Sequence, residues 1–247
     1  MTVPSLTLHA LPPSHPCMTA EAALKLKGLP YERIDLPMGE HPAKMAELYG
    51  EGHTTVPGLM VGDEPVHGSR AILARLEELQ PEPPLFPAGE HADAIREAER
   101  WGDDELQDLG RRIPWGALYF RPEAMGTMAG GPPLDPPGTD FAMRFVRAAW
   151  KYHKLSAVQL HADLQGLPAK LDHVDALIAD GVLGGETPNA ADLQIAPTIR
   201  VMLIVGDLDE LFAGRPCAEL ARRLFPDVQG RVPAGAFPAG WVPSRAA

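Results

Sequence analysis

The stretch Leu11-Pro12-Pro13-Ser14-His15-Pro16-Cys17 follows an alternating segment, residues 5–11, and opens a run of helix-forming residues that ends at Gly28. The alternation predicts a strand, and the glycine is a typical helix stop. Pro16 suits a first helical turn, where its missing N–H costs nothing. Ser14 should therefore lie at a helix N-terminus, whose unpaired N–H groups favour an anion such as a thiolate. Taken alone, this stretch favours a plain N-cap role for Ser14 over a catalytic one.

Composition narrows the class of protein. The chain has 247 residues, enough for two modest domains, and a net charge of −11, which argues against a general nucleic-acid binder. Its two cysteines, Cys17 and Cys217, cannot form a disulfide framework and suit a reducing, cytoplasmic setting. The sequence shows neither a signal-peptide pattern nor an apolar run of the ~20 residues that span a bilayer. We therefore expect a cytoplasmic protein without membrane or nucleic-acid partners.

The first 80 residues predict an α/β domain. Strands are expected at residues 5–11, 29–36, 56–61 and 64–67, with helices near 15–27, 42–49 and 70–79, the last capped by Ser69. A strand, a helix and a strand in so few residues make a parallel unit, and the fourth strand should run antiparallel to the third. The order β-α-β-α-β-β-α is that of a thioredoxin-like domain, a fold analogy at this point.

The rest of the chain predicts helices. We expect a proline-stiffened linker at residues 81–91, an all-helical domain at 92–226 and a surface tail at 227–247. The first expected helix covers residues 92–112, is broken or kinked at Gly110 and Pro114, and resumes at 115–120; a loop follows at 121–140, and further helices are expected at 141–164 and 167–179. A buried helix at 193–205, kinked at Pro197, should be opened by a capping box at Asn189 and Asp192. A last helix is expected at 208–224, followed by a tail anchored by Phe237 and Trp241.

Four segments, in order and on the expected elements, resemble serine-type (theta/delta-like) glutathione transferases of a bacterial kind. They are the turn at residues 11–17, Thr54-Thr55-Val56-Pro57-Gly58-Leu59, Gly68-Ser69-Arg70-Ala71-Ile72, and Asn189-Ala190-Ala191-Asp192. None of them is highly specific alone, but the resemblance covers most of the chain and is clearest at 5–87 and 189–197. It implies a thioredoxin-like domain that holds glutathione, a helical domain that shapes a second pocket, and a homodimer.

The resemblance also implies roles for single residues. Ser14 would hydrogen-bond the glutathione sulfur and lower its pKa, with His15 beside it. Val56, preceded by Thr55 and followed by a cis Pro57, would pair its backbone with the cysteinyl part of glutathione. Ser69 and the N–H groups after it would hold the γ-glutamyl carboxylate, and Arg70 would add a charged contact or remain a solvated helix residue.

One position departs from the family pattern. The residue before the glutamyl-binding serine is usually acidic or an amide that reaches the γ-glutamyl amine, and here it is Gly68. The ammonium therefore loses a partner unless Asp63, Glu64 or a residue of a partner subunit replaces it. The alternative is that a different low-molecular-weight thiol is the ligand.

Other candidates have competing interpretations. Cys17 is better explained as a structural residue than as the nucleophile, because the last position of such a turn points into the helix. His15 is either a ligand contact or a solvent-exposed side chain, and His53 is best explained as a surface loop residue. Residues Arg112, Trp115 and Tyr119 either line an acceptor pocket or belong to the helical core. The histidines show no metal-binding spacing, so no metal is expected.

The sequence as a whole predicts a glutathione transferase, a transferase of alkyl or aryl groups with a role in detoxification. The Ser14-activated thiolate of glutathione, the co-substrate, would attack a small electrophile whose identity the sequence does not give. Two alternatives stay open: a non-catalytic binding or scaffold protein on the same fold, and a transferase that uses another thiol.

Overall fold

The computed structural model describes residues 4–244 of the chain. Contacts divide it into two compact units. The first comprises the residues up to Asp103 together with Gly181–Pro197, and the second comprises Asp104–Asp180 and the residues from Thr198 onward. In the described part, no helix is both long enough and apolar enough to cross a membrane.

The first unit contains a four-stranded mixed sheet. Its strands are β1 (Leu6–Ala10), β2 (Glu32–Asp35), β3 (Gly58–Val61) and β4 (Glu64–His67), in the order β2-β1-β3-β4. Strand β1 runs parallel to β2 and antiparallel to β3, and β4 is antiparallel to β3. The predicted parallel unit and the antiparallel hairpin are both confirmed; the first three strands are shorter than the sequence indicates, and β4 has the predicted limits.

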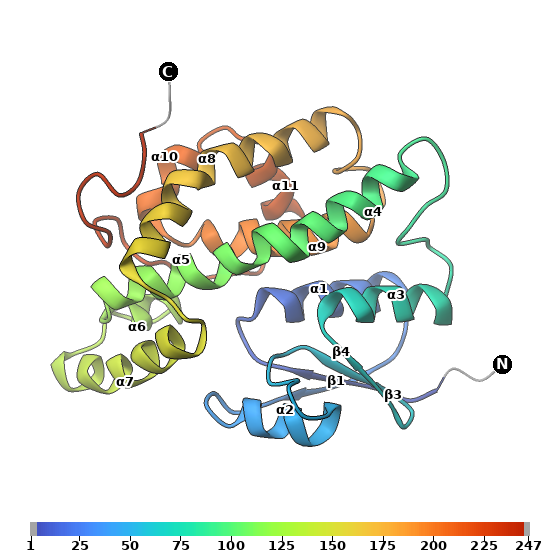
Figure 1. Ribbon diagram of the computed structural model, residues 1–247, viewed down its shortest axis with the longest axis horizontal. Helices are drawn as coiled ribbons and strands as arrows, with labels where there is room; N and C mark the ends of the chain where they lie inside the picture. Colours follow the sequence, from blue (N-terminus) through green and yellow to red (C-terminus); the bar gives the residue numbers. More distant parts are fainter. Residues whose placement is uncertain (1–3, 245–247) are drawn as a thin grey trace. The chain divides into compact units, whose positions relative to one another are not determined.

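Three helices cover this sheet. Figure 1 shows α1 (His15–Leu26) and α3 (Ser69–Leu79) on one face and α2 (His41–Tyr49) on the other. The ring of Tyr49 in α2 lies against Gly58, where a Cβ atom would come within 2.3 Å of the ring. A side chain at position 58 would therefore displace this ring from the sheet. The thioredoxin-like order of elements predicted for the N-terminal domain is confirmed.

The remaining elements are helical, as expected. They are α4 (Ala92–Trp101), a π-helical turn η1 (Gly102–Leu106), α5 (Gln107–Phe120), α6 (Ala124–Met128), α7 (Pro136–Tyr152), α8 (Ala157–Ala179), α9 (Ala190–Met202), a 3₁₀ turn η2 (Gly206–Leu208), α10 (Asp209–Phe212) and α11 (Pro216–Leu224). The fold class predicted from the sequence, an N-terminal thioredoxin-like domain followed by a helical domain, is therefore correct.

Several predicted helix limits are wrong. Helix α5 runs without interruption through Gly110 and Pro114, and the irregular turn lies earlier, at η1. The segment 121–140 is not one loop, because it contains α6 and the start of α7, whose N-cap Asp135 accepts a hydrogen bond from Gly138 N at 2.9 Å. The break expected at 165–166 lies instead at 153–156. The last helix is divided into η2, α10 and α11, and α9 ends at Met202 rather than at 205.

The C-terminal tail is held by hydrogen bonds within the second unit. The Asp207 carboxylate accepts from the backbone N–H groups of Gly235, Ala236 and Phe237 at 3.1–3.3 Å. The side chain of Phe237 is buried, and the ring of Trp241 lies 5.5 Å from that of Phe120. The two predicted anchors of the tail are confirmed. The carboxylate of Asp207 in η2 is a third anchor, because it binds the backbone of the tail.

The capping box of α9 is confirmed. The Asn189 side chain accepts from the N–H groups of Ala191 and Asp192 at 2.9 and 3.1 Å, and the Asp192 carboxylate accepts from Asn189 N at 3.0 Å. The same carboxylate accepts from Gly184 N at 2.8 Å, and it is 1% exposed. One side chain therefore both caps α9 and closes the loop before it.

We expect Asp192→Ala to lower the free energy of unfolding by about 2–3 kcal/mol, because two N–H groups lose their acceptor. Urea denaturation followed by circular dichroism measures this difference. The matched control is Asp192→Asn, which keeps one acceptor oxygen and should cost less. Equal midpoints for the alanine variant and the unmodified protein would show that water replaces the carboxylate at no cost.

Candidate functional site

Ser14 lies where the sequence places it, at the N-cap of α1. Its backbone is extended, its N–H donates to Leu11 O at 2.8 Å, and its carbonyl accepts from Met18 N at 3.1 Å. Its hydroxyl makes no capping hydrogen bond to α1. This weakens the plain N-cap interpretation, because the side chain does not satisfy the helix end. The positive end of α1 therefore stays without a side-chain cap, and the Ser14 hydroxyl is instead hydrogen-bonded with the Cys17 thiol one turn into the helix.

Cys17 is not suited to act as a nucleophile. Its side chain is 2% exposed, and burial raises the pKa of its thiol to about 11, although a hydrogen bond with Ser14 works in the opposite direction. A thiol with this pKa stays protonated at neutral pH. The structural interpretation of Cys17 is supported. His15 is also buried, at 4% exposed, so the alternative of a solvent-exposed side chain is wrong for this residue.

The segment before β3 has the conformation that the resemblance implies. The peptide bond between Val56 and Pro57 is cis. In the described part of the chain, neither the N–H nor the C=O of Val56 has a hydrogen-bond partner. An extended peptide laid beside this residue would therefore find one free donor and one free acceptor.

His67 fixes the same segment from β4. Its Nε2 atom lies 2.8 Å from the Thr55 carbonyl oxygen, so this nitrogen carries the proton and donates. Burial lowers the pKa of His67, and the charge of His53 lowers it further. The His53 ring lies 4.4 Å from the His67 ring, and the His53 side chain is otherwise exposed, as expected for a loop residue. Sequence reasoning did not identify His67.

The N-terminus of α3 differs from the prediction in one respect. Gly68, not Ser69, is the N-cap, with a φ of +89° that favours glycine. A side chain at position 68 would be strained, although nothing lies within 4 Å of where its Cβ would be. Ser69 is the first residue of the helix and is 3% exposed. Its hydroxyl accepts a hydrogen bond from Gln194 Nε2 of α9 at 3.3 Å.

Two carboxylates of the first unit adjoin the start of α3. Gln194 Nε2 bridges from Ser69 to Asp103 Oδ1, which lies 3.0 Å away. Glu99, which is 3% exposed, accepts from Arg70 Nε at 3.2 Å. Arg70 is thus not simply solvated, because it forms an ion pair with Glu99. Glu64, one of the two acidic residues considered as replacements near Gly68, pairs with Arg75 at 2.9 Å.

Sequence reasoning missed Glu99 and Asp103. They stand four residues apart and so share one side of the helical stretch, which was a usable signal. Acidic residues are common on exposed helix faces, however, and nothing in the pattern showed that this side adjoins Ser69.

The three predicted acceptor-pocket residues lie on α5. Arg112 is bound to Asp163 through Nε and Nη2, at 2.6 and 2.9 Å, and to Asp108 at 2.7 Å. The Tyr119 ring stacks on Trp150 at 4.0 Å, and the Trp115 carbonyl accepts from Trp150 Nε1 at 3.0 Å. These residues contribute at least in part to the packing of the second unit. Their contact with a substrate stays a prediction.

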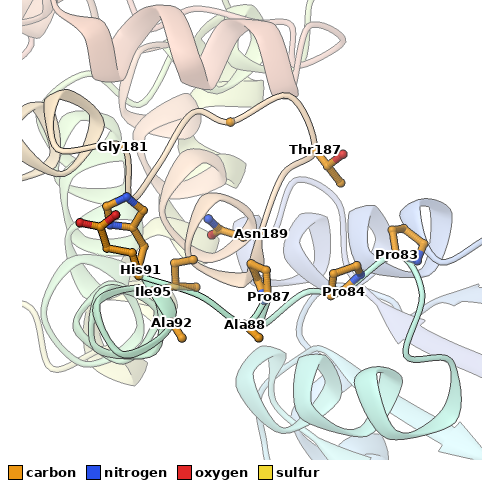
Figure 2. Close-up of a pocket in the computed structure, with 12 residues that line it drawn as sticks. Pro83, Pro84, Pro87, Ala88, His91, Ala92, Ile95, Gly181, Thr187 and Asn189 are labelled. Atoms are coloured by element: carbon orange, nitrogen blue, oxygen red, sulfur yellow. The ribbon is translucent and has the colours of Figure 1, made fainter.

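A pocket of about 370 Å³ lies elsewhere in the first unit (Figure 2). Its walls come from the segment before α4, the start of α4 and the loop before α9, and include Pro83, Pro87, His91, Gly181 and Thr187. No residue that lines it belongs to the predicted glutathione site. Among the described residues, no group of three or more His, Cys, Asp or Glu side chains is placed to hold a metal ion.

Comparison with known proteins shows which family the N-terminal domain resembles. Residues 8–84 match the family described as glutathione S-transferase, N-terminal domain. This part of the chain is thus similar to the N-terminal domain of glutathione S-transferases. The chain is 38% identical over 76 residues to glutathione S-transferase Z1 of Arabidopsis thaliana, covering 30% of this chain and 34% of that protein. It is 37% identical over 95 residues to a zeta-class glutathione S-transferase of Euphorbia esula, covering 37% of this chain and 41% of the relative.

The chain thus spans only about a third to two fifths of the length of the curated relatives it matches. A solved structure extends the likeness of fold to almost the whole chain. A maleyl pyruvate isomerase, described as a bacterial zeta-class glutathione S-transferase, has a TM-score of 0.59 and 19% identity and covers 94% of this chain and 99% of its own. The chain therefore has the glutathione S-transferase fold. The sequence relatives named here are of the zeta class, and the theta/delta-like subclass stays a prediction.

Proposed function

We propose that this protein is a glutathione S-transferase in which Ser14 stabilises the thiolate of glutathione for attack on a small electrophile. The observation that carries the proposal is the state of Ser14. It stands at the N-cap of a twelve-residue helix, yet its hydroxyl makes no capping bond. A sulfur bound there would accept a hydrogen bond from this hydroxyl and would lie near the positive end of the helix dipole. Both interactions lower the pKa of a thiol.

The other contacts follow from the same geometry. The unpaired backbone of Val56 would bond the cysteinyl part of glutathione, with His67 holding the preceding carbonyl in place. The N–H groups at the start of α3 would receive the γ-glutamyl carboxylate. The reaction then needs only thiol ionisation and the proximity of the two reactants.

Asp103 supplies the negative charge that Gly68 does not. Through Gln194 it is two hydrogen bonds from Ser69, and it belongs to the same unit. We propose that it attracts the γ-glutamyl ammonium, which removes the need for an acidic side chain at position 68.

We expect Asp103→Asn to weaken glutathione binding about tenfold, the loss typical of one charge-assisted hydrogen bond. A glutathione analogue that lacks the α-amino group should bind both proteins equally. Isothermal titration calorimetry measures all four affinities. The assignment fails if the substitution weakens both ligands by the same factor.

The acceptor is proposed by class only. The zeta-class relatives and the maleyl pyruvate isomerase fold neighbour favour a small unsaturated acid whose double bond the thiolate attacks. The first experiment is titration with glutathione, followed by turnover assays with a maleyl-type acid and with an aryl halide. Binding of glutathione with turnover of either acceptor supports the proposal.

Gly68 favours one second candidate, a transferase that uses another low-molecular-weight thiol. That candidate requires that glutathione gives no heat of binding while a thiol without an α-ammonium group does. The same titration therefore distinguishes the two.

A further inference from the structure

Helix α7 presents an unusual surface in the second unit. Five of the seven exposed large hydrophobic side chains of the described residues lie between positions 119 and 158. We define the α7 face as the aromatic residues Phe141, Phe145 and Tyr152 together with the cations Arg144, Arg147, Lys151 and Lys154. The aromatic positions follow helical spacing and form one stripe, and the cations of the helix form a second stripe beside it.

The opposite side of α7 anchors the helix. Ala142 and Val146 are buried, and Trp150 Nε1 donates to the Trp115 carbonyl of α5. Figure 1 shows α7 alongside α5 in this unit. The aromatic stripe is left outside this contact. Phe141 is 58% exposed and Tyr152 is 39% exposed, and the Phe141 ring contacts Phe145 at 5.1 Å between centroids.

The charge of this face is opposite to that of the chain. Residues 141–154 hold four of the 22 Lys and Arg and none of the 33 Asp and Glu. The rest of the chain therefore holds the other eighteen Lys and Arg together with all 33 Asp and Glu. The four cations of the α7 face are exposed, and within residues 4–244 none forms an ion pair. Arginines elsewhere, such as Arg75, Arg112 and Arg215, each bind two carboxylates.

We propose that the α7 face binds an acidic amphipathic helix of another protein. The aromatic stripe would take apolar side chains spaced three and four residues apart, and the cation stripe would pair with carboxylates beside them. Helix α7 has 17 residues and is thus about 25 Å long, enough for four to five turns of a partner.

The charge distribution favours this occupant over two others. A second copy would bring together two like-charged faces on two strongly acidic bodies. An anionic bilayer is wide, so the acidic remainder of the chain would be repelled over a Debye length of about 8–10 Å. A single acidic helix is narrow enough to meet the four cations of the α7 face, against which the helix itself sets one exposed carboxylate, Asp140, four residues before Arg144. This inference does not depend on the proposed transferase activity.

Two synthetic peptides of roughly 20 residues test the proposal. Both carry leucine at two positions of each heptad, and the flanking positions are glutamate in one and lysine in the other. We expect the full-length protein to bind the acidic peptide, more weakly as salt rises, and not the basic one. Fluorescence anisotropy measures this affinity.

The variants separate the two stripes. Phe141→Ser with Phe145→Ser, and Arg144→Glu with Arg147→Glu, should each weaken binding of the acidic peptide at least about tenfold. The matched control, Arg222→Glu with Arg223→Glu in α11, makes the same charge change on another exposed helix and should leave the affinity unchanged. Circular dichroism confirms that each variant is folded.

Three results would overturn the proposal. One is a control variant that loses as much affinity as the α7 variants, which would show attraction by general charge. Another is conversion of a dimer to a monomer by the phenylalanine changes, seen by light scattering. The third is sedimentation with phosphatidylserine-containing vesicles, but not with phosphatidylcholine vesicles, that depends on Phe141. The last two would assign the face to a second copy or to a membrane.

Discussion

Replacement of Ser14 by alanine is expected to lower kcat/KM for the conjugation of glutathione by about a hundredfold, the loss typical of one hydrogen-bond donor aimed at an anion. The affinity for glutathione should change much less, because in the proposed binding mode Val56 and the start of α3 hold the peptide backbone and the glutamyl group. The loss should therefore fall mainly on kcat.

The structure also predicts how Ser14→Ala affects stability. Because the Ser14 hydroxyl makes no capping bond and its hydrogen bond with Cys17 is to a sulfur, which is a weak partner, its removal should change the unfolding free energy by less than about 1 kcal/mol. A fall in activity without a fall in thermal stability is thus the expected signature. The thiolate absorbance of bound glutathione, followed against pH, should show a higher thiol pKa in the variant.

Two variants serve as controls. Ser14→Thr keeps a hydroxyl and should retain most of the activity. Cys17→Ala removes the other candidate nucleophile, whose buried thiol has a pKa of about 11, and should retain turnover. If Cys17→Ala is inactive while Ser14→Ala is not, the role assigned to Ser14 is wrong.

The N-terminal domain was largely predictable because its signals are local. Each signal lies within a few residues of the element it predicts: the alternation within β1, the prolines before α1 and the glycine after α1. The cis bond at Pro57 came from the family resemblance and is present in the structure. The capping box at Asn189 was recognised for the same reason, since its partners are three residues apart.

The helical region was less predictable because its glycines serve tertiary contacts. Gly116 lies inside α5, where a Cβ atom would come within 2.4 Å of Leu160 Cδ2 in α8. Gly102 begins the π-helical turn, where a Cβ atom would be 2.7 Å from Ile195 Cγ1. Sequence analysis treats glycine as a helix breaker, but at Gly116 and Gly102 the close packing of a distant side chain leaves no room for a Cβ atom.

The sequence predicted which backbone segments form the candidate site, but it did not predict which charged side chains lie beside them. Ser14, Val56 and Ser69 were placed by motifs. The contacts of Ser69 with Gln194, and of Gln194 with Asp103, join residues 125 and 91 positions apart. No local pattern reports such pairs, so Asp103, the carboxylate proposed to compensate for Gly68, becomes visible only in the fold.

The second large effect is expected at Lys27, which lies just after α1. Replacement of Lys27 by methionine should lower the free energy of unfolding by about 3–5 kcal/mol, the cost of breaking a buried ion pair. The Lys27 side chain is fully buried, and its ammonium donates to the Glu77 carboxylate and to the carbonyls of Pro81 and Pro83, the last at 2.7 Å. Methionine has a similar volume but leaves all three acceptors without this donor.

The pair matters because it holds the segment after α3 in place. Glu77 accepts from the backbone N–H groups of Leu85 and Phe86, at 2.9 and 3.2 Å. Lys27 and Glu77 together thus bind residues 81–86 to the ends of α1 and α3. The double variant Lys27→Met with Glu77→Gln should cost less than the sum of the single changes, because neither charge is then left unpaired. Additive costs in denaturant unfolding would show that the two side chains act independently.

The same pair predicts how stability depends on pH. Burial works against the charge of Glu77, but the hydrogen bonds from Lys27, Leu85 and Phe86 hold its pKa below the ordinary value of 4.5. Its contribution is therefore complete above that value and is lost as the pH falls through the lower pKa of the folded state. Glu77→Gln cannot lose this contribution by protonation, so its stability should approach that of the unmodified protein as the pH drops below about 4.5. A gap that stays constant from neutral pH into this acidic range would show that the charge of Glu77 contributes nothing, and that only its hydrogen-bond acceptors hold the segment.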